Sequence, residues 1–381
     1  MKKRLKNFSL FFISTVFALF LGEVIVRVFL PQNLVYNNDA IWKPDSKFGW
    51  RHHENINERV NFGGGEISFR TDENGFRVNA DDRIDDDVMS QNVLVIGDSF
   101  MEAVQVENKN TLPEVLKRSL NEIPGVSTHF YNSGVAGWGP NHYFMEGQRV
   151  LEEGLLKIDQ VLVFLYVAND MIMWEVDSFH PVNKAQNQLL RMPRNFDRRE
   201  ISSAIIYPTG DYLKRNSQLF MLFKKRNRGL LTKLGMAGYY FPDIFQKDNQ
   251  YVRTWETTTR VCKKINDAFT AQEIPISFVL IPTNYQVNEN IFEEYIENFN
   301  IDTDIVDLEQ PNRILKERFA RDSMQLYDPL YFFREKTKNG LALYGTVDTH
   351  FNAQGHEAMA EYLLPKISEQ LRRSSEPSEN R

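Results

Sequence analysis

Cysteine is almost absent from this chain of 381 residues, which contains only Cys262. A single cysteine excludes an intramolecular disulfide and any metal cluster held by several thiolates. We interpret Cys262 as part of a helix face with a structural role. The compartment stays open, because a chain of this length can bury a large core without disulfides.

The chain also lacks an excess of positive charge and any internal repeat. It has 45 Lys and Arg against 51 Asp and Glu, which gives a net charge of -6. Nucleic-acid binding usually calls for a clustered basic surface, so we expect no nucleic-acid partner. Hydrophobic residues make up 42% and charged residues 25%, an ordinary globular composition that allows one large domain or two small ones.

The amino terminus combines a basic segment with a long apolar run. Residues 1–7 are basic, and residues 8–30 are apolar with Glu23 and Arg27 as the only charged interruptions. A cleaved signal peptide would need a small-x-small site, and we find none near residues 18–23. A transmembrane anchor needs about 20 apolar residues, which this run reaches if Glu23 and Arg27 pair at the far interface. The sequence favours an anchor over a cleaved leader, with the rest of the chain outside the cytoplasm.

Residues 31–90 are expected to form a linker and N-terminal extension. The alternation of polar and apolar residues over 66–70 predicts a short strand or hairpin packed on the main domain. The acidic run 81–87 is typical of a solvated loop.

A rhythm of strands and helices follows, over a main domain at residues 91–372. Short continuous apolar runs predict buried strands at 92–96, 160–166 and 276–282. We expect a further strand at 129–132 and, less distinctly, one at 325–328. Helical spacing predicts helices at 111–120, 141–153, 251–272 and 353–371. Strands that alternate with helices imply a parallel sheet covered on both faces. The polar tail, 373–381, is expected to be disordered.

Two helix starts carry recognisable caps. Thr111, with Glu114 three positions later, predicts a capping box. Asn352 is a suitable cap for the last helix.

An insertion at about 177–250 separates the third and fourth strands. It is rich in Arg and Lys and contains the apolar cluster 219–223. Three interpretations remain open: a packed helix with a solvated basic end, an amphipathic cap over a site, and a membrane-surface contact.

In parallel sheets, ligands bind beyond the carboxyl ends of the strands. Four groups of residues that could carry chemistry are expected at this edge. Each of these groups also has a purely structural interpretation as a turn, a glycine-rich loop or a helix cap. They are Gly97-Asp98-Ser99 after the first strand, the loop with Gly134 and Gly137 after the second, Asn169-Asp170 after the third, and Asp348 with His350 before the last helix.

These residue types suit acyl transfer. A serine at a strand-to-helix turn presents its hydroxyl at the edge of the sheet, and a histidine can accept and return its proton. An asparagine amide and glycine N–H groups can stabilise a developing oxyanion. Asp98 and Asp170 are more typical of loop-ordering residues, and His356 is the rival base that we interpret as structural.

Together the four blocks resemble the SGNH (GDSL-like) hydrolase family. The second block resembles the family pattern Asn-x-Gly-Val-x-Gly-x-Gly, and the third looks like Gly-x-Asn-Asp with Val167 in place of the glycine. The resemblance implies a three-layer α/β/α sandwich with a flavodoxin-like parallel sheet. It implies Ser99 as nucleophile, His350 and Asp348 as its catalytic partners, and no metal or organic cofactor. The implied oxyanion donors are Ser99, Gly137 and Asn169, with Gly134 as the fallback.

Two further features refine the resemblance. Asp348 and His350 are two positions apart, whereas the commonest form is Asp-x-x-His; the shorter spacing resembles acyltransferase-like relatives involved in exopolysaccharide acetylation. The segment Thr71-Asp-Glu-Asn-Gly-Phe-Arg77 resembles an element of membrane-anchored bacterial members. The implied location is the bacterial cell membrane, with a single span and an extracytoplasmic catalytic domain.

Three hypotheses follow for the function. The first is an extracytoplasmic esterase that acts on acylated carbohydrate or lipid. The second is an O-acyltransferase that modifies an exported polysaccharide. The third is an anchored scaffold or binding protein that has lost catalysis.

Overall fold

The predicted apolar runs pair as one parallel sheet. The computed structural model describes residues 2–36, 40–79, 90–171, 209–210, 212–227, 243–247, 252–299, 301–345 and 349–375. Its central strands are β5 (Gln91–Ile96), β6 (Thr128–Asn132), β7 (Gln160–Tyr166), β8 (Ile276–Ile281) and β9 (Leu326–Tyr327). Their order is β6-β5-β7-β8-β9, and every neighbouring pair is parallel. This is the doubly wound, flavodoxin-like order that the sequence resemblance implied.

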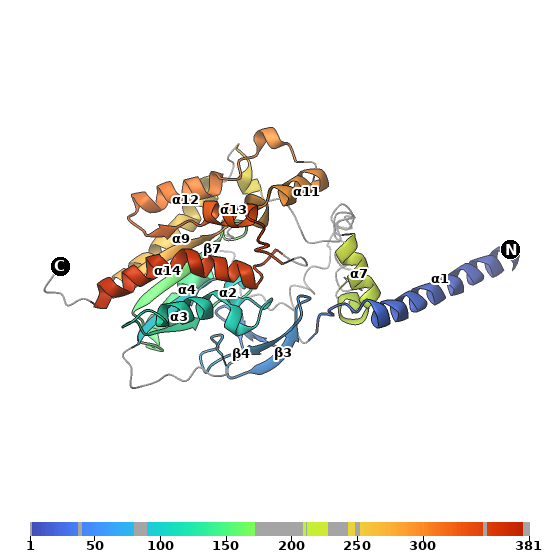
Figure 1. The fold of residues 1–381 in the computed structure, drawn as a ribbon, viewed down its shortest axis with the longest axis horizontal. Coiled ribbons are helices and arrows are strands. Elements are labelled where there is room, and N and C mark those ends of the chain that lie inside the picture. Colours follow the sequence, from blue (N-terminus) through green and yellow to red (C-terminus); the bar gives the residue numbers. More distant parts are fainter. Residues whose placement is uncertain are drawn as a thin grey trace.

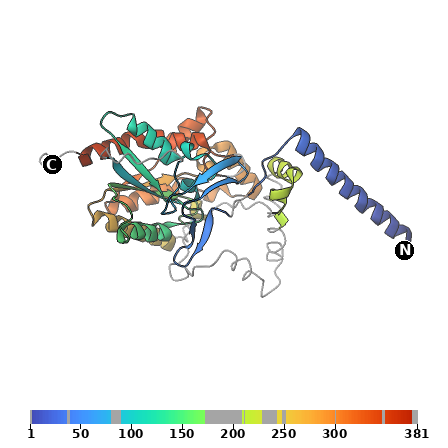
Figure 2. The ribbon, with the colours of Figure 1, turned by 90° about the horizontal axis from the view of Figure 1, so that it is seen from below.

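Helices cover both faces of the sheet, so the fold is a three-layer α/β/α sandwich (Figures 1 and 2). Side chains alternate along β5, so that Val93 and Val95 face one layer whereas Leu94 and Ile96 face the other. The first layer contains α2 (Ser99–Glu102), α3 (Leu112–Asn121), α13 (Leu330–Lys338) and α14 (Ala353–Ser375). The second contains α4 (Pro140–Glu152), α9 (Val252–Thr270) and α12 (Gln310–Arg321).

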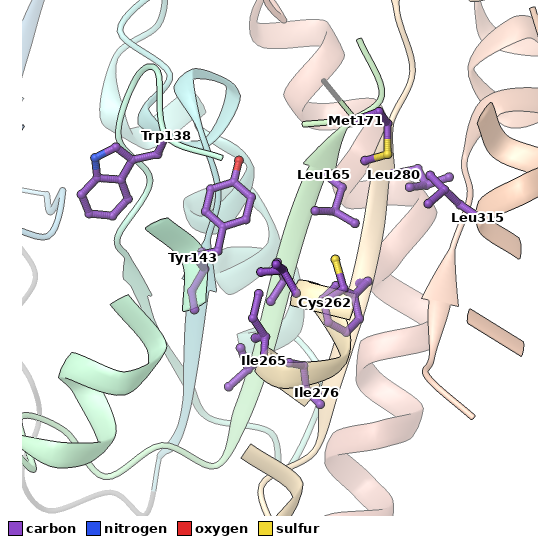
Figure 3. Packing of buried hydrophobic residues seen from close by; sticks show 14 of the residues in the cluster. Trp138, Tyr143, Leu165, Met171, Cys262, Ile265, Ile276, Leu280 and Leu315 are labelled. Atoms are coloured by element: carbon purple, nitrogen blue, oxygen red, sulfur yellow. The ribbon is translucent and has the colours of Figure 1, made fainter. Parts of the chain in front are cut away.

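The core of the second layer explains the single cysteine. Cys262 is fully buried on α9 and belongs to the same apolar cluster as Leu165 and Leu280 of the sheet (Figure 3). Burial raises the pKa of its thiol strongly, which keeps the thiol protonated and unreactive. The structural role predicted for Cys262 is confirmed.

Shorter elements complete the connections. They are η1 (Asn108–Asn110), η3 (Asp243–Phe245), α10 (Asn284–Val287), α11 (Glu289–Phe299) and η4 (Thr303–Ile305).

The N-terminal extension forms two antiparallel hairpins. The first pairs β1 (Trp42–Asp45) with β2 (Gly49–His52), and the second pairs β3 (Asn57–Asn61) with β4 (Glu66–Arg70). Val60 and Phe69 of the second hairpin pack with Val104, just beyond α2. The hairpin predicted around residues 66–70 is therefore present and rests on the main domain. The acidic run 81–87 lies outside the described residues.

The helix α1 (Lys2–Phe29) projects away from the body of the molecule (Figures 1 and 2). From Lys6 to Phe29 it is long and apolar enough to cross a membrane, as judged by length and composition. Its apolar side chains are largely exposed, and the helix α7 (Gln218–Arg226) lies against its C-terminal end. Most of the predicted insertion at 177–250 lies outside the described residues, and α7 is the part that carries the apolar cluster.

One of the two predicted caps is wrong. The hydroxyl of Thr111 caps no N–H of α3 and donates to the carbonyl of Asn108 at 2.8 Å, while the Glu114 carboxylate accepts from the amide of Asn79. The cap at Asn352 is confirmed, because its side-chain oxygen accepts from the Gly355 N–H at 3.0 Å. The predicted tail is too long, since α14 continues to Ser375.

Candidate active site

Ser99 lies at the end of β5, as the first residue of α2. Gly97 permits this sharp entry, because a Cβ there would lie 2.6 Å from the Cγ of Met101. The fully buried carboxylate of Asp98 caps the helix by accepting from the Phe100 N–H at 2.9 Å. The turn thereby leaves the Ser99 hydroxyl at the carboxyl edge of the sheet.

His350 reaches that hydroxyl from the other end of the chain. Its Nε2 lies 2.7 Å from the Oγ of Ser99, although the two residues are 251 positions apart. The imidazole ring packs against Phe100 at 4.9 Å between ring centroids, and Phe100 also contacts the buried ring of Phe351. The packing of His350 against Phe100 thus supports the imidazole in a position for proton transfer with the serine.

The Asp348 carboxylate, predicted to orient His350, lies outside the described residues. Its role stays a prediction. Thr349 and His350 are described, and the backbone carbonyl of His350 accepts from the Gly345 N–H at 2.8 Å, which anchors the loop beside the site.

Asn169 follows β7 and lies beside the same edge. Its amide Nδ2 donates to Asp98 at 3.3 Å, which leaves a second amide proton for a ligand. Burial raises the pKa of Asp98, against the opposing effects of the Phe100 N–H and the charge of His350. Asp98 thus connects the turn of the nucleophile to the predicted oxyanion donor, in keeping with its predicted loop-ordering role.

The strand order explains why these groups meet. The direction of the chain crossovers reverses between β5 and β7, so the loops after these two strands diverge to opposite faces of the sheet, an arrangement at which α/β proteins commonly bind ligands. Ser99 and Asn169 come from those two loops, and Gly137 comes from the loop after β6.

The two glycines of the β6 loop differ in their roles. The N–H of Gly134 donates to the Asn132 side chain at 3.1 Å, and a Cβ at Gly134 would lie 2.7 Å from the backbone nitrogen of Glu102. Gly134 is therefore a packing residue, and the fallback oxyanion role does not fit it. Gly137 is exposed and has φ 78°, a conformation that favours glycine.

Among the described residues, no acceptor binds the backbone N–H of Ser99 or of Gly137. The N–H groups of Ser99 and Gly137, together with the Asn169 amide, are the three hydrogen-bond donors predicted to stabilise the oxyanion.

Asp170 and His356 both lie buried and hydrogen-bonded next to the site, and their predicted structural roles stay predictions. Buried Asp170 accepts from the Tyr143 hydroxyl and the Tyr166 N–H, both at 2.9 Å, and burial raises its pKa well above the usual value. His356 is buried in the first turn of α14, and its Nδ1 accepts from the Leu112 N–H at 3.3 Å. Burial lowers its pKa to about 3, which keeps the ring neutral.

Arg77 supports the site from a distance. It is fully buried, and its guanidinium donates to the carbonyls of Glu102, Ala103 and Val106 at the C-terminal end of α2. The sequence singled out the segment ending at Arg77 by resemblance alone and gave no role for the side chain.

The first N-terminal hairpin, β1 with β2, contributes further contacts that sequence reasoning missed. The buried carboxylate of Glu102 accepts from Trp42 at 2.7 Å and lies 2.8 Å from the Nε2 of His52. Trp50 donates to the carbonyl of Ala136 at 2.8 Å and packs over Gly137. These pairings are distant in sequence and follow no period, so no local pattern announces them.

The structure gives one negative observation on metals. Within the described part of the chain, no group of three or more His, Cys, Asp or Glu is arranged to hold a metal ion.

The chain is similar to several solved structures. One is TesA, at 13% identity and a TM-score of 0.38, with 73% of this chain and 98% of that chain covered. A second is a catalytic mutant of Axe2, an acetylxylan esterase from Geobacillus stearothermophilus, at 12% identity and a TM-score of 0.38, covering 74% and 95%. A third is a lipolytic protein of the G-D-S-L family from Veillonella parvula, at 11% identity and a TM-score of 0.36, covering 72% and 97%. No protein-family model and no curated protein matches the sequence.

Proposed function

We propose that this chain is a serine esterase of the SGNH hydrolase family, anchored in the bacterial cell membrane by α1 with its catalytic domain outside the cytoplasm. Its proposed substrates are acyl esters, acetyl esters above all, of carbohydrate or lipid in the cell envelope. The observation that carries the proposal is the 2.7 Å contact between the Nε2 of His350 and the Oγ of Ser99. A hydroxyl and an imidazole in this contact at a sheet edge form the nucleophile and base of covalent catalysis.

The mechanism follows from these positions. His350 takes the proton of Ser99 as the Oγ attacks the ester carbonyl carbon. The N–H groups of Ser99 and Gly137 and the amide of Asn169 stabilise the oxyanion. His350 then protonates the leaving alcohol, and a water molecule, deprotonated by the same imidazole, hydrolyses the acyl-enzyme. In this proposal Asp348 orients the imidazole and stabilises its charged form.

The experiment is active-site labelling of the full chain with a fluorophosphonate probe, together with hydrolysis of a chromogenic acetyl ester. Wild type should label, and Ser99→Ala should abolish labelling and lower kcat at least about 1000-fold, because the nucleophile is lost. Tyr331→Ala, at an exposed position on α13, is the control that should behave as wild type. A wild type that neither labels nor hydrolyses the ester would favour the anchored scaffold instead.

An O-acyltransferase is the second candidate. The two-position spacing of Asp348 and His350 in the sequence favours it, since the same acyl-enzyme can be resolved by a sugar hydroxyl in place of water. Acetyl release measured with and without an added oligosaccharide distinguishes the two: transfer product that accumulates at the expense of free acetate would identify a transferase.

A further inference from the structure

Glu23 is an acidic side chain inside the apolar helix α1, and its partners lie on α7. Its carboxylate accepts from the hydroxyl of Ser217 at 2.7 Å and from the N–H groups of Gln218 at 2.9 Å and Leu219 at 3.0 Å. Arg27, one turn further along α1, pairs with the same carboxylate at 2.7 Å. Glu23 therefore caps the start of α7, where helix N–H groups otherwise have no partner.

Further contacts hold the two helices together. Arg27 donates to the carbonyl of Asn216 at 2.7 Å, and the N–H of Gln32 donates to the side chain of Gln218 at 2.9 Å. Gly22 allows a close approach, since a Cβ there would lie 3.2 Å from the Cδ2 of Leu219. The start of α7 is thus fixed to a defined level of α1.

That level corresponds to the outer boundary of a bilayer. Residues 8–22 span about 22 Å as a helix, and residues 8–29 span about 33 Å, against a hydrocarbon core of about 30 Å. The contacts with α7 begin at Gly22 and end beyond the helix at Gln32, so α7 lies where α1 would leave the hydrocarbon (Figure 1).

The surface of this segment suits that position. Among the described residues beyond Leu30, the exposed large apolar side chains are Tyr212, Phe223, Ile305 and Tyr331. Two of these four, Tyr212 and Phe223, lie within one short stretch, residues 212–227. The same stretch contains five Lys and Arg and no acidic residue. Exposed aromatic rings combined with basic side chains are typical of helices that lie in the interface of an anionic membrane.

We propose that residues 212–227, which we term the interfacial segment, bind the surface of the bilayer that holds α1, with the Tyr212 and Phe223 rings in the headgroup layer and the exposed side chains of Arg215 and Arg226 near anionic phospholipid. The proposal rests on the membrane anchor proposed above and is independent of the esterase chemistry. Glu23 is the positioning residue that docks the segment on α1. Such a contact would hold the catalytic domain at a fixed orientation over the membrane.

The test uses the full chain in vesicles, with an environment-sensitive fluorophore on a single introduced cysteine. Cys262 is fully buried and stays unlabelled. The probe sites are Phe223→Cys in the segment, Phe17→Cys in the middle of α1, and Tyr331→Cys on the exposed face of the body. In phosphatidylcholine vesicles with phosphatidylglycerol, lipids that carry a quencher near the headgroup should quench the probe at 223, and lipids with a deep quencher should quench the probe at 17. The probe at 331 should stay in water.

Each outcome decides the proposal. Weaker quenching at 223 in vesicles of phosphatidylcholine alone supports the part assigned to anionic headgroups, and equal quenching overturns that part. A probe at 223 that stays in water while the probe at 17 is deep overturns the surface contact and leaves the anchor standing. A probe at 223 shielded from both water and lipid quencher indicates a protein neighbour and also overturns it. A probe at 17 that is not deep removes the anchor and the contact together, whereas labelling of Ser99 tests the esterase separately.

A second pair of variants tests the role of Glu23. Glu23→Leu removes the cap and keeps α1 apolar enough to insert, so the interfacial segment should detach and trypsin should cleave it about fivefold faster or more. Thr15→Val is the matched control, because that hydroxyl bonds the carbonyl of Phe11 within α1. Cleavage at the wild-type rate in Glu23→Leu would contradict the docking role.

Discussion

The carboxylate of Asp98 serves two neighbours at once. One oxygen caps α2 through the Phe100 N–H, and the other accepts from the Asn169 amide. The residue that shapes the turn of the nucleophile therefore also aims a predicted oxyanion donor. Such a shared partner reduces the reorganisation needed as charge develops on the substrate.

Removal of the Asn169 amide tests that donor. Asn169→Ala should lower kcat for a chromogenic acetyl ester about 100- to 1000-fold, because one preorganised donor contributes about 3 kcal/mol to the stabilisation of the oxyanion. The KM should change little, since the charge develops only in the transition state. Steady-state kinetics measures both constants, and circular dichroism verifies that the variant is folded. A loss in kcat smaller than about tenfold would exclude Asn169 from the oxyanion site.

At the scale of elements, the short helix α2 depends on a distant segment for its stability. It has four residues, and Ala103 ends it in the left-handed conformation with φ 53°. The guanidinium of Arg77 donates hydrogen bonds to the carbonyls of Ala103 and Val106 around this end. It also lies over the ring of Phe69 of β4, with its Cζ 4.9 Å from the ring centroid. Burial lowers the pKa of Arg77 to about 10, so the side chain stays charged at neutral pH. The N-terminal extension thus holds the helix on which Ser99 lies.

Arg77→Met should destabilise the protein by about 3 kcal/mol or more, because it leaves buried carbonyls without donors. Arg77→Lys should recover only part of this loss, since one ammonium cannot reproduce the fork of the guanidinium. Urea unfolding measures the free energies. Arg59→Met is the control, because Arg59 forms an exposed ion pair with Glu66 across the β3–β4 hairpin. The free energy of unfolding should change by at most about 1 kcal/mol in this variant. Equal effects at positions 77 and 59 would contradict a special role for Arg77.

At the scale of the whole molecule, two buried histidines connect stability to pH. Burial lowers the pKa of His142 to about 4 and that of His356 to about 3. His142 stacks on Trp138 beside the β6 loop, and His356 packs between α14 and the start of α3. Both rings stay neutral in the folded state at pH values where the unfolded chain binds protons.

The contribution of these two histidines to the free energy of unfolding should therefore be level above about pH 6.5 and fall as the pH falls from 6.5 toward 4. A depressed pKa in the folded state gives this sign, because protons bind preferentially to the unfolded chain. At pH 5 each histidine should lower the free energy of unfolding by about 2 kcal/mol. This follows because pH 5 lies about 1.5 units below the unfolded-state pKa of about 6.5, and each unit corresponds to about 1.36 kcal/mol. His356→Gln should show a drop between pH 7 and pH 5 that is smaller by about this amount. An unchanged drop in urea unfolding would show that His356 takes up a proton in the folded state.

The sequence by itself determined the sheet and the positions that follow its strands. The strands β5, β7 and β8 are largely continuous apolar runs, and parallel strands bring their carboxyl ends to one edge, so Ser99 and His350 could be placed together from local patterns. The structural roles predicted for Asp170, Cys262 and His356 also followed from their local setting.

Only the tertiary structure decided the contacts in which one polar side chain chooses among several partners. Thr111 donates to Asn108 where a capping box was predicted, and Glu23 caps α7, a helix nearly 200 positions away, where pairing with Arg27 alone was expected. The site needs Arg77 and Glu102 as well, but their partners lie on other elements. The reason is physical: hydrophobic periodicity is repeated along the chain and can be read locally, whereas a hydrogen bond depends on whichever group the finished fold brings within 3 Å or so.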